Sequence, residues 1–363
     1  MVLLFFLGGL FFASPVQALE DHRSKLQGAH GDRSTLPKTC RTCHRGMTMK
    51  ISGEETVCLQ CHGSGQDRQM MVSKDYLRSS RSGEIANIND QLRKPYNHPV
   101  LSVRGVHQAK EALPEEVSNA ARHSECVDCH EPHVVEKDKP FRGIGGRRIG
   151  NFMADIDKEY ELCYKCHSSS VNLPSKATNK HAEFKATNPS FHPVEGEGRS
   201  LYVISLKEPY NEREERPGDI SVITCGSCHG SDDPNGPRGP HGSNYPGLLL
   251  QNYEMEDLRP ESPRAYALCY GCHDRTSILG NESFPYHALH ILGNPATNEL
   301  GTSCFSCHDA HGSTKYQHLI RFDEDVVSPN EDEKLEYKAT GVASRHGSCL
   351  LNCHEVEHNP KSY

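Results

Sequence analysis

The sequence predicts a folded chain whose interior is filled largely by something other than amino-acid side chains. Only 35% of the 363 residues are hydrophobic and 7% are aromatic, Trp is absent, and the mean hydropathy is -0.67. These values lie below what a soluble chain of this length usually needs to build a core from its own side chains. Disordered chains also have low hydropathy, but they are rarely rich in Cys or His. With 16 Cys and 23 His, this chain is expected to fold around a large apolar cofactor.

The cysteines identify this cofactor as haem c. All 16 Cys fall into eight pairs, and a His directly follows the second Cys of every pair. In haem c the two thiols add to the two vinyl groups, and the adjacent His binds the iron from the same side. The pattern therefore predicts eight covalently attached haem c groups. The expected attachment residues are Cys40, Cys43, Cys58, Cys61, Cys126, Cys129, Cys163, Cys166, Cys225, Cys228, Cys269, Cys272, Cys304, Cys307, Cys349 and Cys353. The expected proximal iron ligands are His44, His62, His130, His167, His229, His273, His308 and His354.

Three other chemistries of paired cysteines fit the pattern less well. A disulfide scaffold or a set of zinc ribbons gives no reason for a His after every pair. Redox Cys-x-x-Cys motifs come singly in a thioredoxin-like fold rather than eight times. The last pair, Cys349 and Cys353, is separated by three residues instead of two. Its place at the end of the series is the reason to interpret it as an eighth haem site.

Spare histidines recur around the haem sites. In sequence order the sites group in four couples, and the last three couples share one pattern. In each of these, one free His precedes the first site and another follows it closely, which supplies the count needed for bis-His ligation. The distal ligand candidates in register are His98, His133, His192, His241, His287 and His311.

The first couple departs from this pattern. Arg45-Gly46-Met47 stands where the other couples have their post-site His, and both His22 and His30 are available upstream. We prefer His30 as a distal ligand because it lies nearer Cys40. Met47 as a ligand would raise the potential of that haem, and a solvated or packing Met is the alternative. The weaker distal candidates in the whole chain are Met47, His22, His123, His181, His290 and His346.

The paired sites and spare histidines resemble the doubled Cys-x-x-Cys-His multihaem (octahaem) c-type cytochrome family. The resemblance covers about Thr39 to His354, and it implies electron transfer, low-spin bis-His haems in stacked and T-shaped contacts, and little regular secondary structure. The expected fold is therefore a multihaem cytochrome c, mostly loops with short α-helices and very little β-structure, folded around a chain of eight haems. Short helices are expected before the second sites, beginning near Ser52, Asp155 and Ser262.

We expect a cleaved signal peptide at residues 1–18. An uncharged run from Met1 to Phe12 is followed by Ser14-Pro15-Val16-Gln17-Ala18, whose small residues fit a signal-peptidase site. A membrane anchor is the alternative, but the run is short and broken by Gly8 and Gly9. The mature chain is expected to be secreted across the inner membrane into the periplasm or the extracellular space, with no transmembrane span. The expected dihaem modules are 19–94, 95–180, 181–284 and 285–363, the last with the irregular site.

Two classes of function fit the sequence. In the first, the protein is not an enzyme and conducts electrons along closely packed bis-His haems in periplasmic or extracellular respiration, with other multihaem cytochromes or redox proteins as partners. A free shuttle, a filament subunit and a conduit associated with an outer-membrane porin are the open assemblies. In the second, it is a multihaem reductase or oxidase of nitrite, hydroxylamine or sulfur oxyanions with one open haem site; no catalytic side chain is expected. Nucleic-acid binding is disfavoured by the net charge of -8, which two propionates per haem would make more acidic.

Overall fold

The computed structural model describes residues 26–45, 53–102, 124–136, 139–149, 152–169, 173, 177–199, 203–211, 223–294, 296–340 and 345–363. The expected signal peptide lies outside these residues. The chain divides into two compact units. The first takes its described residues from 1–89, 100–109 and 124–157, and the second from 90–99 and 158–363. The four expected dihaem modules are a finer division, and they stay a prediction.

The first unit is built from short helices joined by irregular segments. A cluster of Leu36, Met71 and Leu77 is its buried apolar centre, against which Cys61 packs. Its described elements are α2 (Gly28–Gly31), α3 (Cys40–Cys43), α4 (Glu54–His62), α5 (Gly65–Ser73), α6 (Ser79–Ser82), α8 (Cys126–Cys129) and a hairpin of β2 (Gly145–Ile149) and β3 (Phe152–Asp155). Helix α7 (Ile88–Gln91) follows α6 in the chain.

The second unit is also built from short helices and irregular segments, and its C-terminal part adds a β-sheet. Its apolar centre is the cluster of Leu249, Tyr253, Tyr266 and Ile291. Its helices are α9 (Glu159–His167), α10 (Lys180–Phe184), η2 (Cys225–Ser227), η3 (Pro246–Leu248), α11 (Ala267–Tyr270), α12 (Arg275–Leu279), α13 (His287–Leu292) and η4 (Cys304–Ser306). Its strands are β1 (Tyr96–Asn97), β4 (Ser190–Phe191), β5 (Gly242–Ser243), β6 (Gly312–Ser313), β7 (Val327–Ser328), β8 (Glu336–Ala339), β9 (Gly347–Cys353) and β10 (Val356–Ser362).

Two-residue strands join segments that lie far apart in the sequence. The segment before an upstream His pairs with the Gly-Ser that follows a post-site His: β1 pairs with β5, and β4 pairs with β6, both antiparallel. Gly is required at these positions because an added Cβ would lie 1.8 Å from the Gln91 carbonyl oxygen at Gly242, and 2.2 Å from the Glu183 carbonyl oxygen at Gly312. The first unit has a related contact, a single bridge between Gln27 and Val134.

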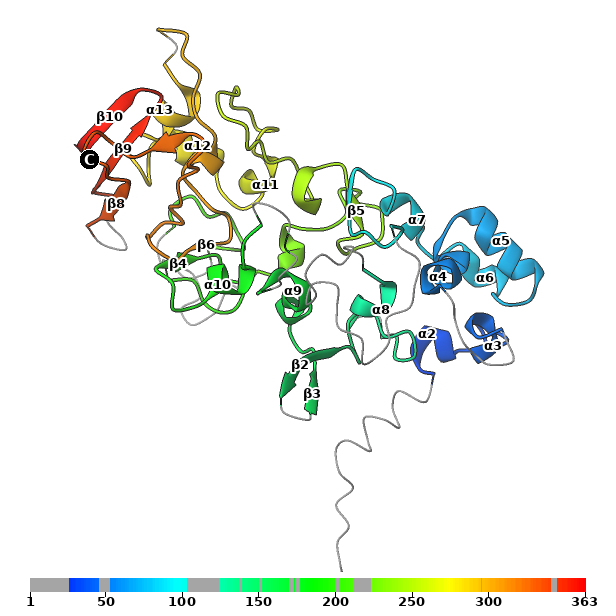
Figure 1. Cartoon of the computed structure of the whole chain (residues 1–363). Coiled ribbons are helices and arrows are strands. Elements are labelled where there is room, and N and C mark those ends of the chain that lie inside the picture. Colours follow the sequence, from blue (N-terminus) through cyan, green and yellow to red (C-terminus); the bar gives the residue numbers. More distant parts are fainter. Residues whose placement is uncertain are drawn as a thin grey trace, which may run out of the picture. The chain divides into compact units, whose positions relative to one another are not determined.

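The C-terminal sheet is larger than the sequence suggested. β10, β9 and β7 are adjacent strands, β8 also pairs with β9, and these strands gather at the red end of the chain in Figure 1. The expectation of short helices is confirmed, whereas the expectation of very little β-structure is wrong for the C-terminal part of the chain. The reason is that tertiary pairing outweighs the local pattern: the last attachment motif lies on β9, between neighbours on both sides.

The expected helix starts are also corrected. Ser262 accepts a hydrogen bond from the backbone of Ala265 in a turn, and α11 begins only at Ala267. Asp155 ends strand β3, so α9 begins later, at Glu159. Ser52 lies outside the described residues, and the N-cap of α4 is Gly53 without a side-chain hydrogen bond. No helix among the described residues is long and apolar enough to cross a membrane.

Candidate haem-binding sites

Seven of the eight attachment motifs have their first Cys in a short α- or 3-10 helix and their second Cys in that helix or just after it. In five of them the backbone N–H of the His donates to the carbonyl of the first Cys at 2.9 Å, as at Cys40–His44. The other two close the ends of α4 and α9, which run through His62 and His167. Along a helix, residues three apart are separated by a rise of about 4.5 Å and share one face. Both thiols of each motif therefore lie on one side of the turn, as the attachment of one haem would require. The five sites with this backbone hydrogen bond have His44, His130, His229, His273 and His308.

Among the described residues, six pairs of imidazole rings face each other at nearly the same distance. Each pair consists of one proximal His and one other His, and their ring centroids lie 6.1 to 6.4 Å apart. Two imidazole–metal bonds of about 2 Å, plus about 1 Å within each ring, give a spacing of about 6 Å. The rings thus stand where one iron atom fits between them. The pairs are His30–His62, His44–His133, His98–His167, His192–His273, His229–His311 and His287–His308.

Hydrogen bonds orient these rings through Nδ1. The upstream histidines donate to the carbonyl just before a post-site His: His30 to Pro132 at 2.8 Å, and His98 to Pro240 at 2.6 Å. His192 bonds to Ala310 in the same way. A ring that donates from Nδ1 keeps the lone pair on Nε2, which is the form that binds a metal.

Proximal rings are oriented by the same means. His229 Nδ1 donates to the Gly247 carbonyl at 2.7 Å, and His308 Nδ1 donates to the His318 carbonyl at 2.9 Å. His273 Nδ1 and the hydroxyl of Ser205 share a hydrogen bond at 2.9 Å. The ligand tautomer is therefore set by the protein at both faces of the candidate iron sites.

Burial keeps the candidate ligands neutral. Desolvation, helped by the charge of neighbouring histidines, lowers the pKa of His62, His167 and His273 to about 4 each. The same two causes lower the pKa of His287 to about 3. At neutral pH these rings are uncharged, so one ring nitrogen of each keeps a lone pair that could bind a metal.

The facing rings are interleaved between couples. An upstream His faces the second site of its own couple, as His98 faces His167. A post-site His instead faces the first site of the preceding couple: His133 faces His44, and His311 faces His229. The first couple, which lacks a post-site His of its own, has His30 facing His62 and His133 facing His44. In the last couple the upstream His287 faces the first site, at His308.

The eighth motif has a different geometry. Cys349 and Cys353 lie on strand β9, where four residues span about 13 Å. The backbone of His354 has φ 52°, in the hairpin turn, and its Nε2 lies 2.8 Å from Oδ2 of Asp257. In this arrangement the two thiols do not meet one haem edge, and the nitrogen that would bind iron is already engaged. The eighth site does not fit the group as the other seven do.

The weaker candidates are not brought to a facing pair by any described contact. His181 stacks on Tyr164 with ring centroids 5.2 Å apart. Nδ1 of His290 bonds to the carbonyl of Tyr286 at 2.8 Å. Nδ1 of His346 lies 3.2 Å from the carbonyl of Tyr363. His241 is one of the candidates in register and not a weaker one; its backbone N–H donates to the carbonyl of Gly239 at 2.9 Å, and its role as a distal ligand stays a prediction. His22, Met47 and His123 lie outside the described residues.

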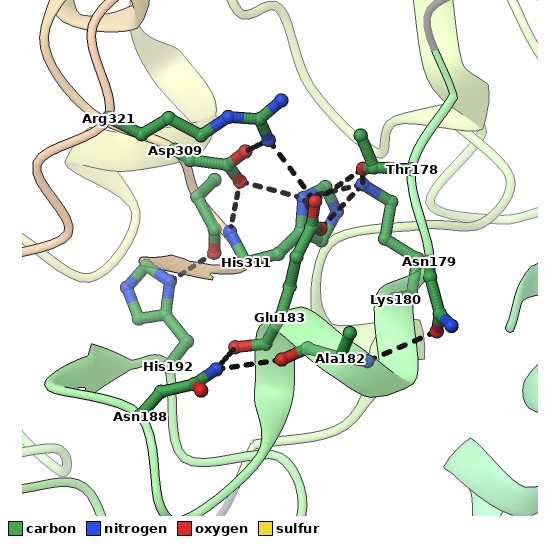
Figure 2. Close-up of polar contacts among 11 residues, drawn as sticks. Thr178, Asn179, Lys180, Ala182, Glu183, Asn188, His192, Asp309, His311 and Arg321 are labelled. Carbon is green, nitrogen blue, oxygen red and sulfur yellow. Dashed lines mark hydrogen bonds and ion pairs between the residues drawn. The ribbon is translucent and has the colours of Figure 1, made fainter. Parts of the chain in front are cut away.

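Two carboxylates beside post-site histidines were missed by the sequence analysis. Glu131 accepts from Nδ1 of His133 at 2.9 Å, and Asp309 accepts from Nδ1 of His311 at 3.0 Å. Figure 2 shows Asp309 next to His311, with Arg321 and Glu183 close by. Each acid stands two residues before its His, so the spacing Glu/Asp-x-His was a signal available in the sequence.

Consecutive sites also contact each other through their thiols. A hydrogen bond between them lowers the pKa of Cys58 and raises that of Cys126. A hydrogen bond with Cys163 likewise lowers the pKa of Cys225. In both cases the second site of one couple adjoins the first site of the next couple.

Two stretches of the chain match known protein families. Residues 150–320 match the family described as outer membrane cytochrome MtrC/MtrF-like, domains II/IV, and residues 119–172 match the family of the doubled CXXCH motif. No curated protein and no solved structure matches the chain. Together with the attachment turns, these matches define a multihaem c-type cytochrome that transfers electrons. Within that class, the two matches support a doubled-CXXCH multihaem c-type cytochrome.

Proposed function

We propose that the protein is an octahaem electron conduit whose haems are held mainly by bis-His ligation. The observation that carries the proposal is the set of six facing imidazole pairs at 6.1 to 6.4 Å. Two histidines on one iron leave no position for a substrate, which favours electron transfer over chemistry at the metal. Haem supplies an iron that changes between the ferric and ferrous states, and the protein supplies its ligands, its burial and its spacing.

The contacts between sites support conduction along the chain. Thiols of consecutive couples lie within interaction distance, as for Cys58 with Cys126 and Cys163 with Cys225. Within the last couples, burial and then the neighbouring thiol Cys269 raise the pKa of Cys304. Short distances between haem edges are what successive electron steps need, and no moving part of the protein is required for them.

The proposed setting is the periplasm or the extracellular space. Residues 150–320 match a family described by its outer-membrane cytochromes, which supports a place at or outside the outer membrane. The proposed partners are other multihaem redox proteins. Self-assembly into a filament and association with an outer-membrane porin are both compatible with such a conduit.

Two measurements on the haem-loaded protein test this proposal. Low-temperature electron paramagnetic resonance of the ferric protein is expected to show low-spin signals from at least six haems. A mainly high-spin spectrum would contradict bis-His ligation and with it the conduit. Intact mass is expected to show eight haems, which requires Cys349 and Cys353 to leave β9 and close into a turn. A mass for seven haems would remove the eighth haem and leave the conduit formed by the others.

A second function is favoured by one observation at the eighth site. His354 is bonded to Asp257 rather than facing another described His ring. If His354 left Asp257 to bind a haem attached there, that iron would have an open position, as the reductase or oxidase of nitrite, hydroxylamine or sulfur oxyanions needs. Binding of one cyanide or nitrite per chain, lost in the double variant Cys349→Ala and Cys353→Ala, would support this alternative. No binding of either anion would contradict it.

A further inference from the structure

The two post-site histidines with described facing partners share an acidic neighbour. Glu131 Oε1 accepts from both the backbone N–H of His133 at 3.1 Å and its Nδ1 at 2.9 Å. Asp309 Oδ1 accepts from the backbone N–H of His311 at 2.9 Å and from its Nδ1 at 3.0 Å. Each carboxylate therefore holds both the ring and the backbone of a candidate iron ligand. The arrangement is repeated at two sites that are far apart in the sequence.

Other candidate ligands of the same chain provide a built-in comparison. The Nδ1 atoms of His30 and His98 donate to neutral backbone carbonyls. At the remaining post-site position, Gly239 stands two residues before His241, with φ +99°. An added Cβ on Gly239 would lie 3.2 Å from the ring of His241, so a side chain there is disfavoured by both space and backbone conformation. The carboxylate thus distinguishes two ligands from their equivalents.

A compact charge network surrounds Asp309 (Figure 2). The side chains of Asp309 and Glu183 are only 11% and 7% exposed. Arg321 Nη1 donates to Asp309 at 2.5 Å and to Glu183 at 3.1 Å. Lys180 donates to Glu183 at 2.7 Å. Two acids and two cations thus balance, and loss of any one of them leaves a net charge beside His311.

The ring of His311 is fixed within this network. Lys180 Nζ lies 3.3 Å from His311 Nδ1, but an ammonium group cannot accept the proton that Nδ1 carries, whereas the carboxylate of Asp309 can. The ring of Phe184 packs edge-on against His311, at 5.5 Å and 88°. The facing ring of His229 is nearly parallel, at 6°. The contact with Asp309 is therefore a fixed feature of the ligand and not a passing surface ion pair.

We propose that Asp309 and Glu131 are positioning residues that lower the reduction potentials of the haems at Cys225 and Cys40. The proposal rests on the bis-His ligation proposed above. A carboxylate that accepts from Nδ1 makes the imidazole a stronger electron donor, and second-sphere hydrogen bonding of this kind tunes the metal. A ferric haem carries one more positive charge than a ferrous haem, so a nearby buried negative charge favours the ferric form. The chain would then contain two low-potential haems among carbonyl-anchored neighbours of higher potential.

The test is a spectroelectrochemical titration of the haem-loaded chain and of three single variants. Asp309→Asn keeps an acceptor oxygen but removes the charge, and one haem is expected to become easier to reduce by about tenfold in its ferrous-to-ferric ratio, or 59 mV for one electron. Arg321→Gln removes a cation from the same network, and the same haem is expected to shift in the opposite direction. Glu256→Gln is the control, because Glu256 pairs only with exposed Arg259, and no haem is expected to shift.

Potential shifts of opposite sign in Asp309→Asn and Arg321→Gln distinguish electrostatic tuning from a merely structural role. Equal shifts in Asp309→Asn and Glu256→Gln, or shifts of the same sign in Asp309→Asn and Arg321→Gln, would overturn the proposal. If Asp309→Asn does not fold, Glu131→Gln tests the same effect at the haem of Cys40, with an upward shift expected and no shift overturning it. Paramagnetic resonance of the wild-type protein keeps the two proposals apart: a low-spin spectrum with no charge-dependent shift refutes tuning alone, whereas a high-spin spectrum refutes the ligation beneath it.

Discussion

Replacing His311 with Gly tests the interleaved arrangement of ligands most directly. His311 follows the attachment site of His308 by three residues, but its ring faces His229, at 6.2 Å and within 6° of parallel. The variant should therefore open the haem at Cys225–Cys228 and leave its nearer neighbour unchanged. Because one facing pair is lost, the expected signal is one high-spin iron per chain, or about one-eighth of the total iron if eight haems are attached.

The assay is quantitative paramagnetic resonance of the ferric variant, followed by titration with free imidazole. Imidazole should enter the space left by the His311 side chain and restore the low-spin signal. The groups that surround the His311 ring remain in the variant and can hold the added imidazole in the same position. His181→Gly is a matched control, because His181 stacks on Tyr164 and does not face a proximal His. No high-spin iron is expected in that control.

Removal of individual haems identifies which iron has been opened. In a background with Cys225→Ser and Cys228→Ser, His311→Gly should add no high-spin signal. In a background with Cys304→Ser and Cys307→Ser, it should still add one. The reverse result would mean that the post-site His binds the haem beside it in the sequence, and the interleaved arrangement would be refuted.

Two further predictions concern folding. Gly312→Ala places a Cβ 2.2 Å from the Glu183 carbonyl oxygen and should destabilise the β4–β6 contact by about 1 to 3 kcal/mol. Gly196→Ala is the control and should be nearly neutral, because nothing lies within 4 Å of the added Cβ. Denaturant unfolding measures both variants, and equal stabilities would contradict the packing argument. Burial raises the pKa of Glu54 to about 7 from 4.5, so the folded chain holds this proton more tightly than the unfolded chain, and the free energy of unfolding should fall by at most about 3 kcal/mol as pH rises from about 4.5 to 7. Glu54→Gln should flatten this part of the pH profile, and an unchanged slope would show that another group causes it.

Much of the candidate site was accessible from the sequence because its chemistry is local. A Cys-x-x-Cys-His motif closes within one helical turn, so the spacing alone predicts two thiols and an imidazole on one side, as at Cys40–His44. Recurrence in register then pointed to upstream and post-site histidines, and His98 and His311 are among those that face proximal rings. The resemblance to doubled-motif cytochromes is confirmed by the family matches.

Other features were beyond local pattern. The sequence grouped each post-site His with the couple in which it stands, whereas His133 faces His44 of the preceding couple. The widened last motif was expected to behave like the others, but pairing with β8 and β10 draws Cys349 and Cys353 into an extended strand. Neither feature follows from residue spacing, because both depend on partners that are distant in the sequence.

The sequence by itself determined the chemistry of this protein: paired thiols, adjacent proximal histidines and a supply of spare imidazoles. These depend on bonds and turns a few residues long, for which order along the chain is enough. Only the tertiary structure decided which two histidines face each other and which of them have a carboxylate at Nδ1. It also showed that seven attachment motifs form helical turns, whereas the eighth lies on a strand. The physical reason is that a distal ligand is chosen by proximity in space, and proximity is fixed by contacts such as β4 with β6, whose partners the sequence does not name.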